Sequence, residues 1–129
     1  MAKDKAKITL ELPYPPSINH YYGRGKAGHV YIKPKGVHYR KLVAIATLCA
    51  SAAQVFPDWS GGQRLAMSLI VRPPDKRKRD LDNTLKALKD AMQRAAVYKD
   101  DCQIREYREP FKFAEPVKGG KVIVTLKEL

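Results

Sequence analysis

The segment from residue 82 to residue 96 has the apolar spacing of an amphipathic helix, and it limits the possible folds more than any other stretch. At about 100° per residue, its apolar side chains fall within an arc of roughly 100° on one face. They are Leu81, Leu85, Leu88, Met92, Ala95 and Ala96. Apolar segments with strand character precede this helix at 65–71 and follow it at 102–109. This order of strand, helix and strand is typical of a helix packed on a sheet.

The rest of the chain supplies a second helix and further strands. Residues 8–12 alternate apolar and polar side chains, as a half-buried strand does, and three nearby prolines end that strand. We expect a long loop over 17–36 with a short strand near 29–33, a helix over 37–54, a hairpin turn at 116–121 and a last strand at 122–128. The pattern predicts an α+β, α/β-like fold: a small mixed sheet with two main helices packed on it. We expect one domain over residues 1–129, with residues 1–7 as a flexible basic N-terminus.

The charge balance favours a polyanionic partner. The chain has 25 Lys and Arg against 13 Asp and Glu, a formal net charge of +12. Such an excess suits nucleic acid first and an anionic membrane surface second. Two cysteines, Cys49 and Cys102, are too few for a disulfide framework or a four-cysteine zinc site. Their apolar surroundings predict buried, reduced thiols.

No segment has the composition of a membrane span or a signal peptide. The N-terminal residues lack an apolar core, and the longest apolar-leaning run, LVAIATLCASAA, has about 12 residues against the ~20 that span a bilayer. We therefore expect a cytoplasmic, nucleoid-associated protein, cellular or virus-encoded, with no membrane partner and no small-molecule substrate.

A run of four cations leads directly into two carboxylates. Lys76, Arg77, Lys78 and Arg79 precede Asp80, and Asp82 follows one residue later. Side chains two residues apart diverge by about 200° on a helix but share a side in extended backbone. If both carboxylates hold one metal ion, the helix must begin at or after Asp82, with Asp80 still extended. Alternatively, one aspartate caps the helix and the other lies in its positive N-terminal field.

A third carboxylate and a lysine are further candidates. Asp101, with Asp100 beside it, follows the helix, and the alternative for both is ordinary turn chemistry. A helix of ~14 residues is about 20 Å long. Asp101 can therefore reach Asp82 only if the next strand returns antiparallel, or if the site forms across a fold or dimer boundary. Lys86 neighbours Asp82 at i+4, although both also suit a solvated helix face.

Three carboxylates and a lysine beside a basic run fit metal-assisted hydrolysis of a phosphodiester. Oxygen ligands select Mg²⁺, with Mn²⁺ as a substitute. The metal would polarise the phosphate and help to generate hydroxide, while a lysine would stabilise the developing charge or orient water. The chain has no phosphate-binding GxxxxGK[ST] loop, no HExxH, and no EF-hand glycine or glutamate at the required positions.

The segment RKRDLDNTLKALKDAM, with the DD pair at 100–101, closely resembles the RusA family of Holliday junction resolvases. The segment LPYPPSINHYY is similar to that family's LPxPPSxNxxY pattern, and the KGG before the last strand is similar as well. The resemblance covers about residues 8–126. It implies an Mg²⁺-dependent homodimer that nicks four-way DNA junctions by paired symmetric cuts during recombination and repair.

The resemblance also implies roles for single residues. Asp80, Asp82 and Asp101 match the metal-binding catalytic aspartates, and Lys86 matches the essential lysine. Accessory candidates are Asn83, Asp90 and Asp100. The cations at 76–79 are expected to grip the phosphate backbone. In the long loop, we expect Tyr21, Tyr22, Arg24 and Lys26 to contact the open junction centre by stacking and charge.

Two other functions compete with a junction nuclease. A non-catalytic, basic nucleic-acid-binding protein would share the charge but need no metal, and a metal nuclease for flaps or single-stranded DNA would share the site but not the substrate. The flank of Thr84, Ala87 and Ala91 offers small side chains against which another element can pack closely, and a partner subunit is one candidate for it.

Overall fold

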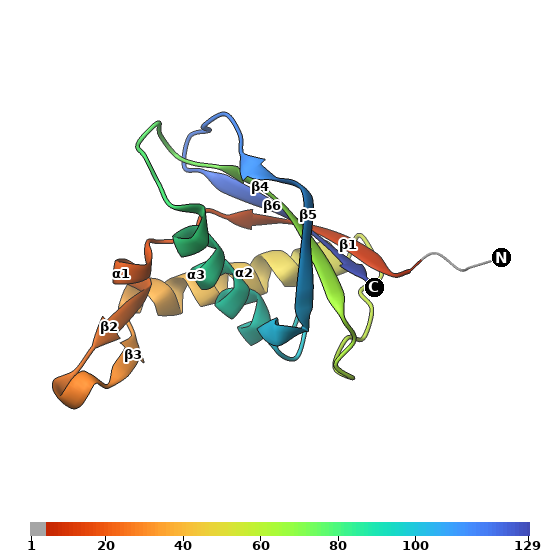
Figure 1. Cartoon of the computed structure of the whole chain (residues 1–129), viewed down its shortest axis with the longest axis horizontal. Coiled ribbons are helices and arrows are strands. Elements are labelled where there is room, and N and C mark those ends of the chain that lie inside the picture. The colour runs from red at the N-terminus through yellow and green to blue at the C-terminus, as the bar shows by residue number, and fades with distance from the viewer. Residues whose placement is uncertain (1–4) are drawn as a thin grey trace.

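A four-stranded mixed sheet forms the centre of the protein (Figure 1). The computed structural model describes residues 5–129. The strands are β1 (Lys7–Pro13), β4 (Leu65–Arg72), β5 (Ile104–Phe113) and β6 (Lys121–Glu128), in the spatial order β1-β6-β4-β5. β6 pairs antiparallel with both β1 and β4, whereas β4 and β5 are parallel. The predicted α+β class with a small mixed sheet is confirmed.

One face of the sheet is buried beneath two helices, α2 (Pro34–Ser51) and α3 (Leu81–Arg94). β1 and β6 alternate along their length, so that Ile8, Leu10 and Leu12 face the core and the residues between them face outward. On the outward face, Thr9 bonds Thr125 across the strands, and Lys121 pairs with Glu11. This alternation is the physical reason that the strands were readable from the sequence.

The strand-helix-strand unit at 65–113 forms as its pattern predicts. α3 connects parallel β4 and β5, a connection that needs a crossover of this length. Leu85, Leu88 and Met92 are buried on its core face. The small flank of Thr84, Ala87 and Ala91 is also buried, within the chain's own core where α2 packs against α3. The suggestion that a partner subunit fills this flank is therefore wrong.

The segment expected to be one long loop contains regular structure. It holds a single helical turn, α1 (Ile18–Tyr21), and a two-stranded antiparallel hairpin of β2 (Tyr22–Arg24) and β3 (Val30–Ile32). A short 3-10 turn, η1 (Lys26–Gly28), connects the two strands. In Figure 1 this hairpin projects away from the sheet and helices, next to the N-terminal end of α2.

The expectations for the cysteines and for the N-terminus are met only in part. Both cysteines are free, as predicted, but both are exposed rather than buried, because Cys49 lies on the outer side of α2 and Cys102 in a surface turn. The predicted basic N-terminus at 1–7 falls partly outside the described residues, and Lys7 begins β1. Within the described part of the chain, neither long helix has the length and hydropathy needed to span a bilayer.

Candidate active site

Asp80 and Asp82 lie together at the N-terminus of α3. Asp80 is the N-cap residue, with extended backbone angles of φ −96° and ψ 123°, and its Oδ1 accepts a hydrogen bond from the Asp82 backbone N–H at 2.9 Å. The helix begins at Leu81, one residue earlier than a shared metal site was expected to require. Asp80 therefore caps the helix, which was the alternative to a shared metal site. A carboxylate has a second oxygen, so capping leaves Asp80 able to bind a cation.

Both carboxylates are exposed, and Asp82 occupies the first turn of α3. Negative side chains are favoured there by the positive end of the helix dipole. Thr84 adds a hydrogen bond from its Oγ1 to the Asp80 carbonyl oxygen at 3.4 Å. The local fold therefore holds two oxygen donors at one helix end, facing solvent.

Asp101 lies at the opposite end of α3. It opens a short 3-10 helix, η2 (Asp101–Gln103), and its backbone N–H donates to Gln93 Oε1 at 3.0 Å. Gln93 lies eleven positions after Asp82 in α3, which corresponds to about 17 Å along the helix axis. Among residues 5–129, no three acidic, histidine or cysteine side chains are placed to hold one metal ion. β5 runs back toward the N-terminal end of α3, but Asp101 precedes this strand and therefore stays at the C-terminal end of the helix, away from Asp80 within a single chain.

Lys86 lies one turn beyond Asp82 on the exposed side of α3. Its Nζ is 5.4 Å from the centroid of the Tyr22 ring at the base of the hairpin, a cation–π arrangement. Partial burial raises the pKa of the Tyr22 phenol, and the charges of Asp90 and, more weakly, Asp101 act in the same direction. The Tyr22 ring is only half-buried and so remains accessible from one side.

Two of the accessory carboxylates have structural partners. Asp90 binds Arg40, with the Arg40 Nη2 at 2.8 Å from its Oδ2, and it also accepts a hydrogen bond from the Tyr21 hydroxyl. Asp100 caps η2 by accepting the Cys102 N–H at 2.9 Å, which holds the pKa of the Asp100 carboxyl below its usual range. Both groups stabilise local structure, and we assign neither to a metal.

Tyr21 is fully buried and cannot stack on DNA, which corrects the expectation for this residue. Burial, and then its hydrogen bond to Asp90, raise the pKa of its phenol. Arg40 Nε donates to the Tyr21 hydroxyl at 3.0 Å, so Tyr21 fastens the base of the hairpin to α2 and α3. Tyr31 is the exposed aromatic residue of the hairpin, and its ring packs against Gly23. Arg24 and Lys26 are exposed, and their predicted contact with DNA remains a prediction.

The basic run at 76–79 divides into outward and inward cations. Lys76, Arg77 and Lys78 are exposed. Arg79 turns inward: its Nη2 lies 2.8 Å from Asp75 Oδ1, and its guanidinium covers the Tyr14 ring at 5.6 Å. Arg79 therefore shapes the loop before α3, while the other three cations remain available to phosphate groups.

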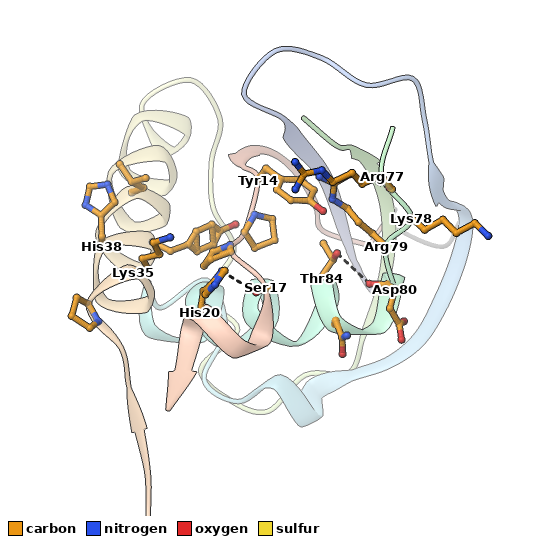
Figure 2. A pocket seen from close by; sticks show the side chains of 16 residues that line it. Tyr14, Ser17, His20, Lys35, His38, Arg77, Lys78, Arg79, Asp80 and Thr84 are labelled. Carbon is orange, nitrogen blue, oxygen red and sulfur yellow. Dashed lines mark hydrogen bonds between the residues drawn. The ribbon is translucent and has the colours of Figure 1, made fainter. Parts of the chain in front are cut away.

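A cleft of about 930 Å³ opens beside Asp80, between this loop and the first turns of α2 (Figure 2). Arg77, Arg79, Asp80 and Thr84 lie on one side of the cleft, and Lys35 and His38 lie on the other. The sequence pattern assigned no function to Tyr14, His20, Lys35 or His38, which line the cleft. The sequence signal at this place is weak: three prolines around Tyr14 in PYPPS, which predict only the end of a strand.

Comparison with known proteins identifies the family. Residues 13–127 match the family described as Endodeoxyribonuclease RusA. The chain belongs to the RusA family. The matched range includes the hairpin, both ends of α3 and Asp101, so the RusA match covers every element described above as part of the candidate site.

Curated relatives of this RusA family chain match it over nearly its whole length. It is 35% identical over 126 residues to the crossover junction endodeoxyribonuclease RusA of Escherichia coli strain K12, with 94% of each chain covered. It is 37% identical to the proteins of the same name from Enterobacteria phage HK97, with 92% of each chain covered, and from Enterobacteria phage 82, with 93% covered. The family suggested by the motif in residues 77–92 is therefore confirmed.

Proposed function

We propose that this chain is an Mg²⁺-dependent endodeoxyribonuclease that resolves four-way DNA junctions by paired symmetric nicks. The observation that carries the proposal is the exposed pair Asp80 and Asp82 at the N-terminus of α3, directly after three exposed cations, in a member of the RusA family. The relatives' names, crossover junction endodeoxyribonuclease, support the choice of substrate.

The donor set at this helix end fits a hard divalent cation. Asp80 and Asp82 supply only oxygen ligands, which favour Mg²⁺ over zinc, and both are open to solvent and to a phosphate group. Two carboxylates and waters suffice to hold Mg²⁺ loosely, because this ion keeps several of its waters. When bound, the metal supplies Lewis-acid polarisation of the phosphate oxygens and a lowered pKa of water.

The protein's own residues then position the strand. Three exposed cations precede the carboxylates in the chain, Lys76, Arg77 and Lys78, and they neutralise phosphates of the strand beside the metal position. Lys86 lies one turn along α3 from Asp82, within reach of a phosphate held at the helix end. Its ammonium group stabilises negative charge on that phosphate, and its place beside the Tyr22 ring limits the directions in which it extends.

We further propose that Asp101 completes the site across a homodimer. Within one chain, Asp101 lies about 17 Å along α3 from Asp82. A two-fold axis passing beside the middle of α3 would bring the N-terminal end of one α3 opposite the C-terminal end of the other. Asp101 of the partner subunit would then approach Asp80 and Asp82. The same operation generates two identical sites, which suits a junction that is itself two-fold symmetric.

The experiment that tests the function is nicking of a labelled synthetic four-way junction. The wild-type protein is expected to introduce symmetric nicks with Mg²⁺ or Mn²⁺ and none with EDTA, and Asp82→Asn is expected to bind the junction without cutting it. Linear duplex and flap DNA, run side by side, separate a junction enzyme from a flap or single-strand nuclease. Junction binding that is strong, salt-dependent and never followed by cutting would instead indicate a non-catalytic binding protein.

A further inference from the structure

The cleft beside Asp80 is lined by apolar as well as charged side chains. Six of its lining residues carry rings or an aliphatic side chain rather than a charge and form its apolar wall: Tyr14, Pro15, Pro16, Pro34, Tyr39 and Leu42. At about 930 Å³, the cleft is at the upper end of the range for small-ligand sites. A phosphate backbone needs only cations, so an apolar wall of this size requires another explanation.

The wall is held rigid by contacts within the protein. Tyr39 is buried, and its hydroxyl donates to the Pro13 carbonyl oxygen at 2.7 Å, which fixes α2 against the proline-rich segment. Tyr14 is held between the Arg79 guanidinium at 5.6 Å and Gly120, where an added Cβ would lie 2.7 Å from the Tyr14 Cβ. Gly120 also has φ +69°, so both its conformation and the contact require glycine. A preformed cleft costs little ordering when a ligand enters.

Polar groups are few and lie around the apolar wall. Asn83, Ser17 and His20 offer donors and acceptors, and Ser17 Oγ lies 3.2 Å from His20 Nδ1. Lys35 and His38 lie on the α2 side, and Arg77 lies on the side of the basic run (Figure 2). Because Tyr39 is buried, the ring surface that a base can contact is that of the half-buried Tyr14 and the prolines. Ring surface, a few polar groups and cations on both sides are together the features with which proteins bind unpaired nucleotides.

The cleft is continuous with the candidate metal site. Asp80 contributes to its lining, and Asn83 follows Asp82 on the first turns of α3. A strand whose phosphate lies at Asp80 and Asp82 would therefore place its neighbouring nucleotide at the mouth of the cleft. In Figure 2, Lys78 points away from the cleft, so the outer cations can hold the backbone while a base turns inward.

We propose that this cleft binds an unpaired nucleotide of the junction strand, directly beside the phosphodiester that is cut. This inference rests on the proposed function for the position of the cut. Duplex DNA keeps its bases stacked and paired, but strands at a four-way crossover can release a base at a smaller cost. The cleft would thus select an opened crossover over duplex and read the base at the cut.

The test is a binding cycle with the non-cutting Asp82→Asn protein. Junctions carry an abasic nucleotide at one position at a time around the crossover, and dissociation constants are measured without metal. Loss of the base at one position is expected to weaken binding by about tenfold, the typical effect of one lost stacking contact. Two variants alter the cleft: the double variant Lys35→Ala/His38→Ala, and the single variant His38→Trp, which adds bulk to the cleft. Each should weaken binding to the intact junction and abolish the sensitivity to the missing base.

The matched control is Lys41→Ala, because Lys41 is also exposed on α2 but does not line the cleft. It removes the same charge as Lys35→Ala and should keep the full abasic effect. The proposal is overturned if no abasic position matters by more than about twofold, or if both cleft variants retain the abasic effect. The nuclease proposal would fail in a different assay, if the wild-type protein made no nicks with Mg²⁺. The binding measurements need no metal and can be interpreted in either case.

Discussion

At the scale of single residues, Asp80 combines a structural and a chemical role. Its Oδ1 caps α3, and its charge lies beside the proposed metal position. Asparagine is as good an N-cap as aspartate but is a weak ligand for Mg²⁺. The two roles can therefore be separated by two substitutions at the same position.

We predict that Asp80→Asn leaves the free energy of unfolding within about 0.5 kcal/mol of wild type while nicking is lost. Asp80→Ala should also lose nicking and cost about 1 kcal/mol, because the Asp82 N–H loses its acceptor. Urea unfolding and the junction assay measure the two effects. Nicking by Asp80→Asn at the wild-type rate would remove Asp80 from the metal site.

Asp90 was an accessory site candidate by resemblance to the family, but its contacts within the chain are structural. It and Arg40 are each about four-fifths buried, with 19% and 22% of their side chains exposed. We predict that Asp90→Ala costs about 2 kcal/mol of unfolding free energy, because the Arg40 charge and the Tyr21 hydroxyl lose their partner.

The matched control for Asp90→Ala is Glu106→Ala. Glu106 also pairs with an arginine, Arg108, at 2.9 Å, but both side chains are about half exposed. Exposed ion pairs contribute little, so its loss should cost less than about 0.5 kcal/mol. Equal costs for the two variants in urea unfolding would show that the buried network is not what fastens the hairpin base.

At the scale of elements, the long segments were predictable and the short ones were not. β4 and α3 have enough residues for their apolar periods to stand out, and both form within one or two residues of the predicted bounds. α1, β2 and β3 have three or four residues each, too few for a period, and Gly23 and Gly25 suggest a loop. Gly23 instead lies in a strand, where the Tyr31 ring packs over the position that a Cβ would occupy.

The hairpin of β2 and β3 carries an exposed aromatic side chain and cations on an element that projects from the body. We predict that Arg24→Ala with Tyr31→Ala weakens junction binding by about tenfold and lowers the salt dependence, while stability changes little. Filter binding at several salt concentrations measures this. Val55→Ala, at a residue 91% exposed beyond the other end of α2, is the control and should bind as wild type.

At the scale of the whole molecule, the sequence supplied candidate acidic residues but not their arrangement. Asp80 and Asp82 could be placed together because they are two residues apart at a helix start. Asp101 could not, because it precedes β5 and so stays at the C-terminal end of α3, while β5, which is parallel to β4, runs back toward the N-terminal end of α3. The cleft was also unpredictable, because its two sides come from segments about forty residues apart in the chain.

The most direct test of the account uses heterodimers of defined composition, made by linking two protomers. If Asp101 completes the partner's site, a dimer of Asp82→Asn with Asp101→Asn keeps one intact site and nicks one strand. A dimer of wild type with the Asp82→Asn/Asp101→Asn double variant then has no intact site and does not cut. The reverse pattern, with cutting only by the wild-type and double-variant dimer, would contradict assembly of the site across the dimer.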